Sequence, residues 1–303
     1  MENESFLRKL NRQKVSYLFI ALPFLLFFVF QLVPLFASFF LSFTEYDVVH
    51  PPKFVGLDNY KTILFDDPLF WKSIGNTVIY VVGVVPLGVC ISLILAVAID
   101  QKIKFKNLFK SIFFLPTITA IIAVSVIWKW LYAGEKYGLF NYAIMKFGGQ
   151  PVDWLASPAW TLPSIMVMSI WAGLGYNMIL FLAGLQTIPH TMYEAAEIDG
   201  AGFWRKFFHV TLPLLKPTIV FASMMSFIFS FQVFEQVYIM TGDQGSIGGV
   251  LNSGLTIVAY LYDQGFQKFH MGYASALAYM VALCVFVITM INKAITKESH
   301  VNY

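Results

Sequence analysis

Residues 194–217 read EAAEIDGAGFWRKFFHVTLPLLKP, a polar and partly basic stretch between two long apolar runs. The runs cover about residues 161–188 and 218–240, and each is long enough to cross ~30 Å of hydrocarbon as a helix. A stretch between two membrane-crossing helices is a loop at one surface of the membrane. The fold therefore depends on how many such runs the chain contains and on which side this loop lies.

The first half of this loop is predicted to be a short helix that ends at a glycine. Thr191 can serve as its N-cap, and Glu194 three residues later completes a capping box, which satisfies two otherwise unpaired backbone N–H groups. Gly200 suits the left-handed position that ends a helix, and Gly202 loosens the following turn. The pattern predicts a helix, a turn and a second helix.

The second half combines aromatic and basic side chains: Trp204, Arg205, Lys206, Phe207 and Phe208. Such a segment suits a membrane interface, with the rings among the headgroups and the cations in water. Pro213 and Pro217 are expected to end it and to mark re-entry into the membrane. Ala195 and Ala196 leave a low-relief helix surface that another protein can approach closely, which the interfacial interpretation alone does not explain.

The composition is that of a polytopic membrane protein. Of the 303 residues, 58% are hydrophobic and only 12% are charged, and the mean hydropathy is +0.69. In soluble domains about a quarter of the residues are charged. The net charge of +3 is small and the basic residues form no continuous stripe, so we expect no nucleic-acid partner.

Six apolar runs are predicted to be transmembrane helices: about residues 17–43, 74–99, 108–131, 161–188, 218–240 and 271–291. With the loop over 189–217 they form a single all-α transmembrane domain over residues 1–303. The first run is longer than the apolar core of a signal peptide, and no A-x-A-like site follows it. We therefore expect this run to be retained as the first of six spans.

Basic residues are concentrated on one side of these spans. Thirteen of the twenty lie there: Arg8, Lys9, Arg12, Lys14, Lys102, Lys104, Lys106, Lys110, Arg205, Lys206, Lys216, Lys293 and Lys297. Loops rich in Lys and Arg stay in the cytoplasm. Both termini and the 189–217 loop are therefore predicted to be cytoplasmic.

Catalytic and metal-binding patterns are missing from the sequence. There is no G-x-x-x-x-G-K-[ST] phosphate loop and no G-x-S-x-G nucleophile motif. The five histidines form no H-x-x-x-H pair, and Cys90 and Cys284 each lie within an apolar run, where a structural role is expected. We predict a protein that is not an enzyme, with no catalytic residue, no metal and no cofactor of its own.

At this point the loop resembles a known motif. The loop is similar to the EAA motif of permease subunits of binding-protein-dependent ABC importers. The matching residues are Glu194, Ala195 and Ala196, then Gly200, then Val210, Leu212 and Pro213, with Val210 in place of the usual Ile. The resemblance implies the type I ABC importer permease fold, in which this loop is the coupling helix that docks on a cytoplasmic ATPase. The residues it assigns to ATPase coupling are Glu194, Ala195, Ala196, Asp199, Gly200, Phe207, Phe208, Leu212 and Pro213.

The resemblance extends over most of the chain. The segments SFTEYD, FVGLDNY, IWKWLY, GLGYNMILFLAGLQTIP and MGYASALA are similar to those of carbohydrate-uptake permeases of the MalF or UgpA type. It implies a multi-pass protein of the bacterial cytoplasmic membrane. The implied partners are a second homologous permease, an ABC ATPase dimer that uses ATP and Mg²⁺, an extracytoplasmic solute-binding protein, membrane lipid and a carbohydrate substrate.

Polar side chains on the fourth and fifth runs are candidates for the substrate pathway. Ser169, Gly173, Tyr176 and Asn177 lie on one helix face, and Ser226 and Ser230 belong to a stripe on the next helix. The resemblance places Ser169, Gly173, Tyr176, Ser226 and Ser230 at sugar-contact positions. The alternative is that these small and hydroxylated residues only allow close helix packing. Glu235, near the end of the fifth run, is either at the pocket mouth or at a contact with the partner permease.

An ion-coupled secondary transporter of a small polar solute is the alternative function. Such carriers place ionisable residues deep in the membrane. The candidates here, Glu235 and Lys129, lie near the ends of their runs. The substrate stays open among disaccharides, longer oligosaccharides, uronic-acid chains and glycerol phosphates.

Overall fold

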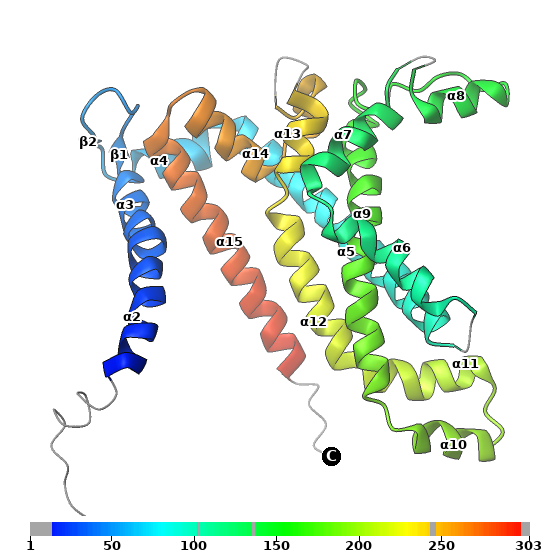
Figure 1. Cartoon of the computed structure of the whole chain (residues 1–303). Helices are drawn as coiled ribbons and strands as arrows, with labels where there is room; N and C mark the ends of the chain where they lie inside the picture. Colours follow the sequence, from blue (N-terminus) through cyan, green and yellow to red (C-terminus); the bar gives the residue numbers. More distant parts are fainter. Residues whose placement is uncertain (1–13, 102–103, 135–136, 243–246, 298–303) are drawn as a thin grey trace, which may run out of the picture. The chain divides into compact units, whose positions relative to one another are not determined.

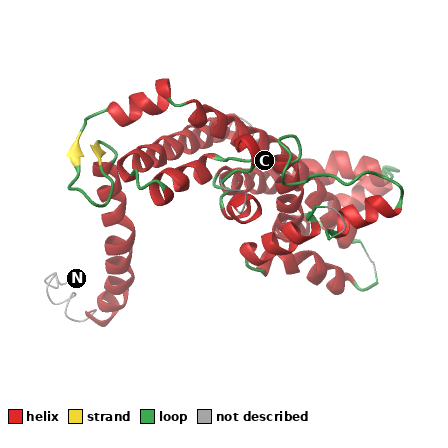
Figure 2. Cartoon of the chain, turned by 90° about the horizontal axis from the view of Figure 1, so that it is seen from above, coloured by secondary structure: helices red, strands yellow, loops and turns green. Residues whose placement is uncertain are grey.

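The computed structural model describes residues 14–101, 104–134, 137–242 and 247–297. The basic residues Arg8, Lys9, Arg12 and Lys102, which contribute to the predicted orientation, lie outside this part of the chain. Helices dominate the described residues, and Figure 2 shows the two short strands in yellow. The described residues form two compact units, one within residues 14–66 and 264–280 and the other within residues 67–263 and 281–297.

The first unit contains the helix predicted as the first span. This helix comprises α2 (Lys14–Phe27), the π-helical turn η1 (Phe28–Leu32) and α3 (Val33–Leu41). After it, β1 (Thr44–Glu45) and β2 (Lys53–Phe54) pair antiparallel, and α4 (Asp58–Lys61) and η2 (Thr62–Asp66) follow. The unit also includes most of η6 (Asp263–Gln267) and the first turns of α15 (Met271–Lys297), whose Gly272 lies against the Thr44 carbonyl with no room for a Cβ.

The second unit is built around two long helices, α5 (Pro68–Asp100) and α9 (Thr161–Gln186), in the centre of Figure 1. Its other elements are α6 (Lys106–Ile118), α7 (Ile121–Leu131), α8 (Leu139–Lys146), α10 (His190–Ile198), α11 (Phe203–Lys206), η3 (Phe207–Thr211), α12 (Leu212–Phe231), α13 (Glu235–Thr241), η5 (Val250–Asn252), α14 (Ile257–Tyr262) and the end of α15. Asp67 caps α5, because its carboxylate accepts from the backbone N–H groups of Leu69 and Phe70.

The predicted spans correspond to these helices, with two differences. Within the described residues, five helices are long and apolar enough to cross a membrane, and a sixth span is counted if α6 and α7 are taken together. These two helices meet at an angle of 98°, so the run over 108–131 is broken rather than straight. The run over 218–240 is also divided, because α12 ends at Phe231 and α13 begins at Glu235. Apolarity alone indicated neither break.

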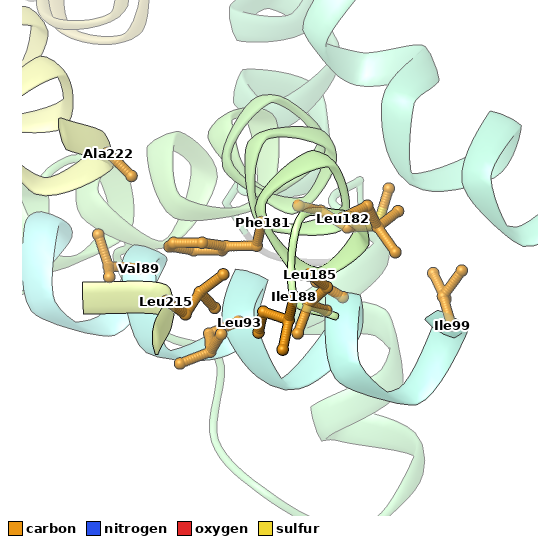
Figure 3. Close-up of a cluster of buried hydrophobic side chains, with 11 residues drawn as sticks. Val89, Leu93, Ile99, Phe181, Leu182, Leu185, Ile188, Leu215 and Ala222 are labelled. Atoms are coloured by element: carbon orange, nitrogen blue, oxygen red, sulfur yellow. The ribbon is translucent and has the colours of Figure 1, made fainter. Parts of the chain in front are cut away.

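The core of the second unit lies where α5, α9 and α12 pack together (Figure 3). Phe181 and Met178 of α9 are fully buried between Val89 of α5 and Leu215 of α12. Close packing and polar contacts between helices hold membrane helices together, because lipid removes most of the hydrophobic driving force. A contact of this kind joins α5 to α9, where the Ser92 hydroxyl donates to the Leu174 carbonyl over 3.0 Å.

Candidate functional site

The segment over 189–217 forms two helices at one end of α9, as Figure 1 shows. The first of them, α10, begins differently from the prediction. Its N-cap is Pro189, with no side-chain hydrogen bond, and Thr191 lies inside the first turn. The predicted capping box of Thr191 and Glu194 is therefore wrong, because the proline starts the helix two residues earlier.

The end of α10 confirms the role predicted for Gly200. Gly200 has φ +74°, the left-handed conformation that glycine adopts without steric cost. The Ala201 N–H donates to the Ala196 carbonyl over 2.8 Å, and the Gly200 N–H donates to the Glu197 carbonyl over 3.0 Å. These two bonds form a Schellman motif, which satisfies the last carbonyls of the helix.

The second helix does not end at a proline. α11, η3 and α12 run on as one apolar helix from Phe203 to Phe231. Gly202, with an extended backbone, precedes its first turn. Pro213 lies in the first turn of α12 and Pro217 lies inside the same helix. The predicted break at these prolines is wrong. The π-helical turn over Phe207–Thr211 changes the hydrogen-bond spacing just before them, and the helix continues through both prolines.

Two side-chain contacts hold α10 against the helix that follows it. The Lys206 amine donates to the Glu197 carboxylate over 2.7 Å, and this contact lowers the pKa of Glu197. The Tyr193 and Thr211 hydroxyl oxygens lie 3.1 Å apart in a hydrogen bond. Sequence reasoning did not identify these pairs, because partners nine and eighteen residues apart across a turn leave no periodic signal.

A cavity of about 570 Å³ lies between these helices and the end of α5. Tyr193, Glu194 and Glu197 of α10 line one side, and Asp100 of α5 contributes a carboxylate. Lys206 and Phe203 line it from α11. The inner side of the loop therefore carries three carboxylates and one amine around this cavity.

The predicted coupling residues divide into an exposed group and a packed group. Glu194, Ala195, Asp199, Gly200, Phe208 and Pro213 are exposed, and Ala196 is half-buried. Phe207 and Leu212 pack instead against the core cluster of α5, α9 and α12. The neighbouring Ile198 is 87% exposed and Trp204 68% exposed. The loop is therefore anchored at one end and presents an apolar and acidic surface at the other.

The structure brings two of the predicted pathway residues together. Asn177 of α9 is 6% exposed, and its amide nitrogen donates to the Ser226 hydroxyl of α12 over 3.0 Å. Tyr176, one residue earlier, is 38% exposed and meets Phe229 of α12 edge to face. The α9 and α12 faces named from the sequence therefore meet in the second unit.

The other pathway candidates are more dispersed. The Ser169 hydroxyl donates to the sulfur of Met168 over 3.9 Å, and Ser230 is buried in α12. Gly173 faces open space. Glu235 is exposed in the first turn of α13, beyond the break that ends α12.

The ionisable residues do not suggest an ion-binding centre. Lys129 lies in the last turn of α7, where its amine donates to the Ile239 carbonyl over 3.0 Å. In the part of the chain that the structure describes, no three His, Cys, Asp or Glu side chains are grouped so as to hold a metal ion.

Comparisons with known proteins agree with this architecture. Residues 88–299 match the family described as "Binding-protein-dependent transport system inner membrane component". The chain is 37% identical to the probable ABC transporter permease protein YesP of Bacillus subtilis, over 96% of this chain and 92% of the relative. It is 35% identical to the arabinooligosaccharides transport system permease AraP of the same organism, over 93% and 88% of the two chains. It is 36% identical to the lactose transport system permease LacF of Rhizobium radiobacter, over 93% and 94%.

A solved structure shows the same fold. A chain of a bacterial ABC transporter involved in the import of the acidic polysaccharide alginate superposes with a TM-score of 0.85 at 22% identity, over 98% of this chain and 100% of that one. The matched family, the full-length relatives and the shared fold lead to one conclusion: the chain belongs to the binding-protein-dependent transport system inner membrane components, the non-catalytic permease subunits of ABC importers.

Proposed function

We propose that this permease imports a sugar or oligosaccharide. The proposal is supported by the relatives, whose names include arabinooligosaccharides, lactose and, for the MalF protein of Thermococcus litoralis at 33% identity, trehalose and maltose. The paired polar and aromatic groups at Asn177, Ser226 and Tyr176 suit a substrate that exchanges water for hydrogen-bonding partners. An ion-coupled carrier is not favoured, because Glu235 and Lys129 lie at helix ends.

The proposed mechanism depends on the exposed surface of α10, where the ATPase would bind. Glu194, Ala195 and Asp199 are solvent-exposed on a helix with no buried residue, so the chain itself leaves this surface without a packing partner. A cytoplasmic ATPase is the partner that the motif implies. ATP and Mg²⁺ act in that ATPase, and α10 follows its closure.

Movement of α10 is transmitted to the substrate pathway through a continuous helix. The α11–η3–α12 helix is continuous from the loop at Phe203 to beyond Ser226, and Tyr193 of α10 is hydrogen-bonded to Thr211 at its π-helical turn. A displacement of the loop therefore moves the helix that carries Ser226 relative to Asn177 of α9. Alternating access follows if the Asn177–Ser226 contact is made in one state and opened in the other.

The complete importer in this proposal has four kinds of component. They are this chain, a second homologous permease, an ATPase dimer and an extracytoplasmic solute-binding protein. Both termini and the α10 loop face the cytoplasm of the producing cell. The solute-binding protein selects among carbohydrates, while Ser169, Gly173, Tyr176, Asn177, Ser226 and Ser230 form the passage.

The experiment that tests the coupling role compares two glycines of one turn. Gly200→Asp places a side chain at φ +74° and a charge beside the docking surface, and we expect it to abolish uptake at normal membrane expression. Gly202→Asp is the matched control, because Gly202 has an extended backbone at the N-cap of α11, where Asp is favoured. Gly202→Asp should keep uptake. Normal uptake by Gly200→Asp would contradict the coupling assignment.

A further inference from the structure

Helix α8 lies at the end of α9 opposite the α10 loop, as Figure 1 shows, and its described neighbours hold it closely. Asn141 of α8 is fully buried. Its amide oxygen accepts from the Val152 N–H over 2.9 Å and from the Trp154 indole N–H over 3.1 Å. Its amide nitrogen donates to the Val152 and Ala133 carbonyls over 2.9 and 3.3 Å. One side chain therefore fixes α8 to both ends of its loop.

Aromatic rings hold the same face of α8. Phe140 packs against Tyr132 with ring centres 5.3 Å apart, against Trp128 at 5.9 Å and against Trp154 at 6.3 Å. Trp128 also meets Trp171 of α9. The orientation of α8 is thus set by contacts with α7 and with the Trp154 segment, and α7 in turn packs against the membrane-length helix α9.

The opposite face of α8 is apolar and exposed. Leu139 is 50% exposed and Tyr142 55% exposed, and Ala143 and Lys146 complete the same helix face. Phe147, at the C-cap, is 91% exposed. A surface helix of a soluble protein usually presents charged and polar side chains on its exposed face, whereas the exposed face of α8 carries Leu139 and Tyr142 and ends at Phe147.

The position of Phe147 is fixed by the end of the helix. Gly148 has φ +83° and its N–H donates to the Met145 carbonyl over 3.0 Å, while the Gly149 N–H donates to the Ile144 carbonyl over 2.9 Å. This is a Schellman motif. Phe147 is therefore held in a defined position with its side chain exposed.

The location of α8 favours lipid as its partner. It begins eight residues after α7 ends at Leu131, and α7 ends with Trp130 exposed to its surroundings. Trp160, 45% exposed, marks the start of α9. Tryptophan and tyrosine gather where the hydrocarbon meets the headgroups. The apolar face of α8 therefore belongs to a segment that begins and ends with exposed tryptophans, Trp130 at the end of α7 and Trp160 at the start of the membrane-length helix α9.

We propose that the face formed by Leu139, Tyr142, Ala143, Lys146 and Phe147 lies in the lipid headgroup region of the leaflet opposite the α10 loop. Phe147 and Leu139 enter the acyl boundary, the Tyr142 hydroxyl stays at headgroup level, and the Lys146 amine extends to lipid phosphate. In this role α8 anchors the broken α6–α7 helix while α12 moves during transport. The anchoring role rests on the proposed function, whereas the lipid contact does not.

The test measures what surrounds this face. In the full chain with Cys90→Ser and Cys284→Ser, spin labels are placed singly at Tyr142→Cys, Ala143→Cys and Phe147→Cys, and the protein is reconstituted in phosphatidylethanolamine and phosphatidylglycerol vesicles. Gln150→Cys, exposed just beyond the Schellman glycines, is the aqueous control, and Ile127→Cys, exposed on α7, is the hydrocarbon control. Ala143→Cys does not remove an aromatic side chain, so the measurement at residue 143 can still be made if Tyr142→Cys or Phe147→Cys disturbs folding.

We expect collisions with oxygen to exceed those with a water-soluble nickel complex at residues 142, 143 and 147, as at residue 127, and the reverse at residue 150. Preferred collision with the nickel complex at residues 143 and 147 would overturn the proposal. Labels that are accessible to nickel in vesicles and become protected only when a solute-binding protein is added would overturn it in favour of a protein-docking surface. Neither readout depends on uptake, so failure here is distinguishable from failure of the coupling role.

Discussion

Helices α8 and α10 are two short loop helices at opposite ends of α9 that end in the same way and are held differently. Both close with a Schellman motif, at Gly148 with φ +83° and at Gly200 with φ +74°. α8 is fixed by a fully buried Asn141 and by aromatic rings that pack around Phe140. α10 has no buried residue; it is held by the Tyr193–Thr211 and Glu197–Lys206 hydrogen bonds and by Tyr193, which packs against the core cluster.

The difference indicates what each loop does. A helix with its own buried polar anchor keeps its position whatever binds it. A helix with exposed surfaces and few internal contacts has little resistance to displacement, and its position is set by its partner. We therefore expect the α8 loop to stay fixed and the α10 loop to move during transport.

The largest expected effect is on the fixed helix. Asn141→Ala leaves the Val152 N–H and the Trp154 indole N–H without their acceptor, and we expect it to lower the free energy of unfolding by about 2–4 kcal/mol. Tyr193→Phe, which removes one hydrogen bond of α10, should cost about 1 kcal/mol. Thermal unfolding in mild detergent measures both. Equal losses would mean that the two helices are held equally.

The two Schellman glycines give a matched pair. A Cβ at Gly148 or Gly200 meets no atom within 4 Å, so Ala at either position costs only the left-handed conformation, about 1–2 kcal/mol. We expect equal losses of thermal stability but a loss of substrate uptake in Gly200→Ala alone. Uptake that falls equally in both variants would remove the functional distinction between the loops.

The smallest effect concerns the ion pair at the edge of α10. Lys206 lowers the pKa of Glu197 below its ordinary value of 4.5. The ion pair therefore contributes to stability at pH values above 4.5, and this contribution is lost as the pH falls through the lowered pKa. Glu197→Gln should therefore reduce uptake less than Gly200→Ala, by the same factor at pH 6 and pH 8. A reduction that depends on pH between these values would show that another titrating group controls the loop.

Much of the fold followed from the sequence because membrane spans are long, apolar and uninterrupted. The runs over 74–99 and 161–188 became α5 and α9. The 98° bend between α6 and α7 and the break after Phe231 did not follow, because Pro116 before the first break and Gln232 and Glu235 at the second are side chains that an unbroken membrane helix also tolerates. Lipid tolerates a broken helix where neighbouring helices cover its backbone, and that depends on tertiary packing.

The candidate site was predictable where a single backbone position decides it. Gly200 was identified from its place after a helical stretch, and its left-handed conformation confirms the prediction. The capping box failed because Pro189 starts α10 earlier than Thr191. The Asn177–Ser226 contact joins residues 49 positions apart, so the sequence indicated two suitable faces but not which side chains meet.

The coupling claim is tested most directly by a photo-crosslinking residue at one exposed alanine of each helix, Ala195 of α10 and Ala143 of α8. The full chain is irradiated in its native membranes, and crosslinked partners are identified by mass spectrometry. We expect position 195 to capture an ATPase with a phosphate-binding loop, and position 143 to capture no ATPase. Absence of the ATPase at position 195 in membranes that contain it, or its capture at position 143, would contradict the account.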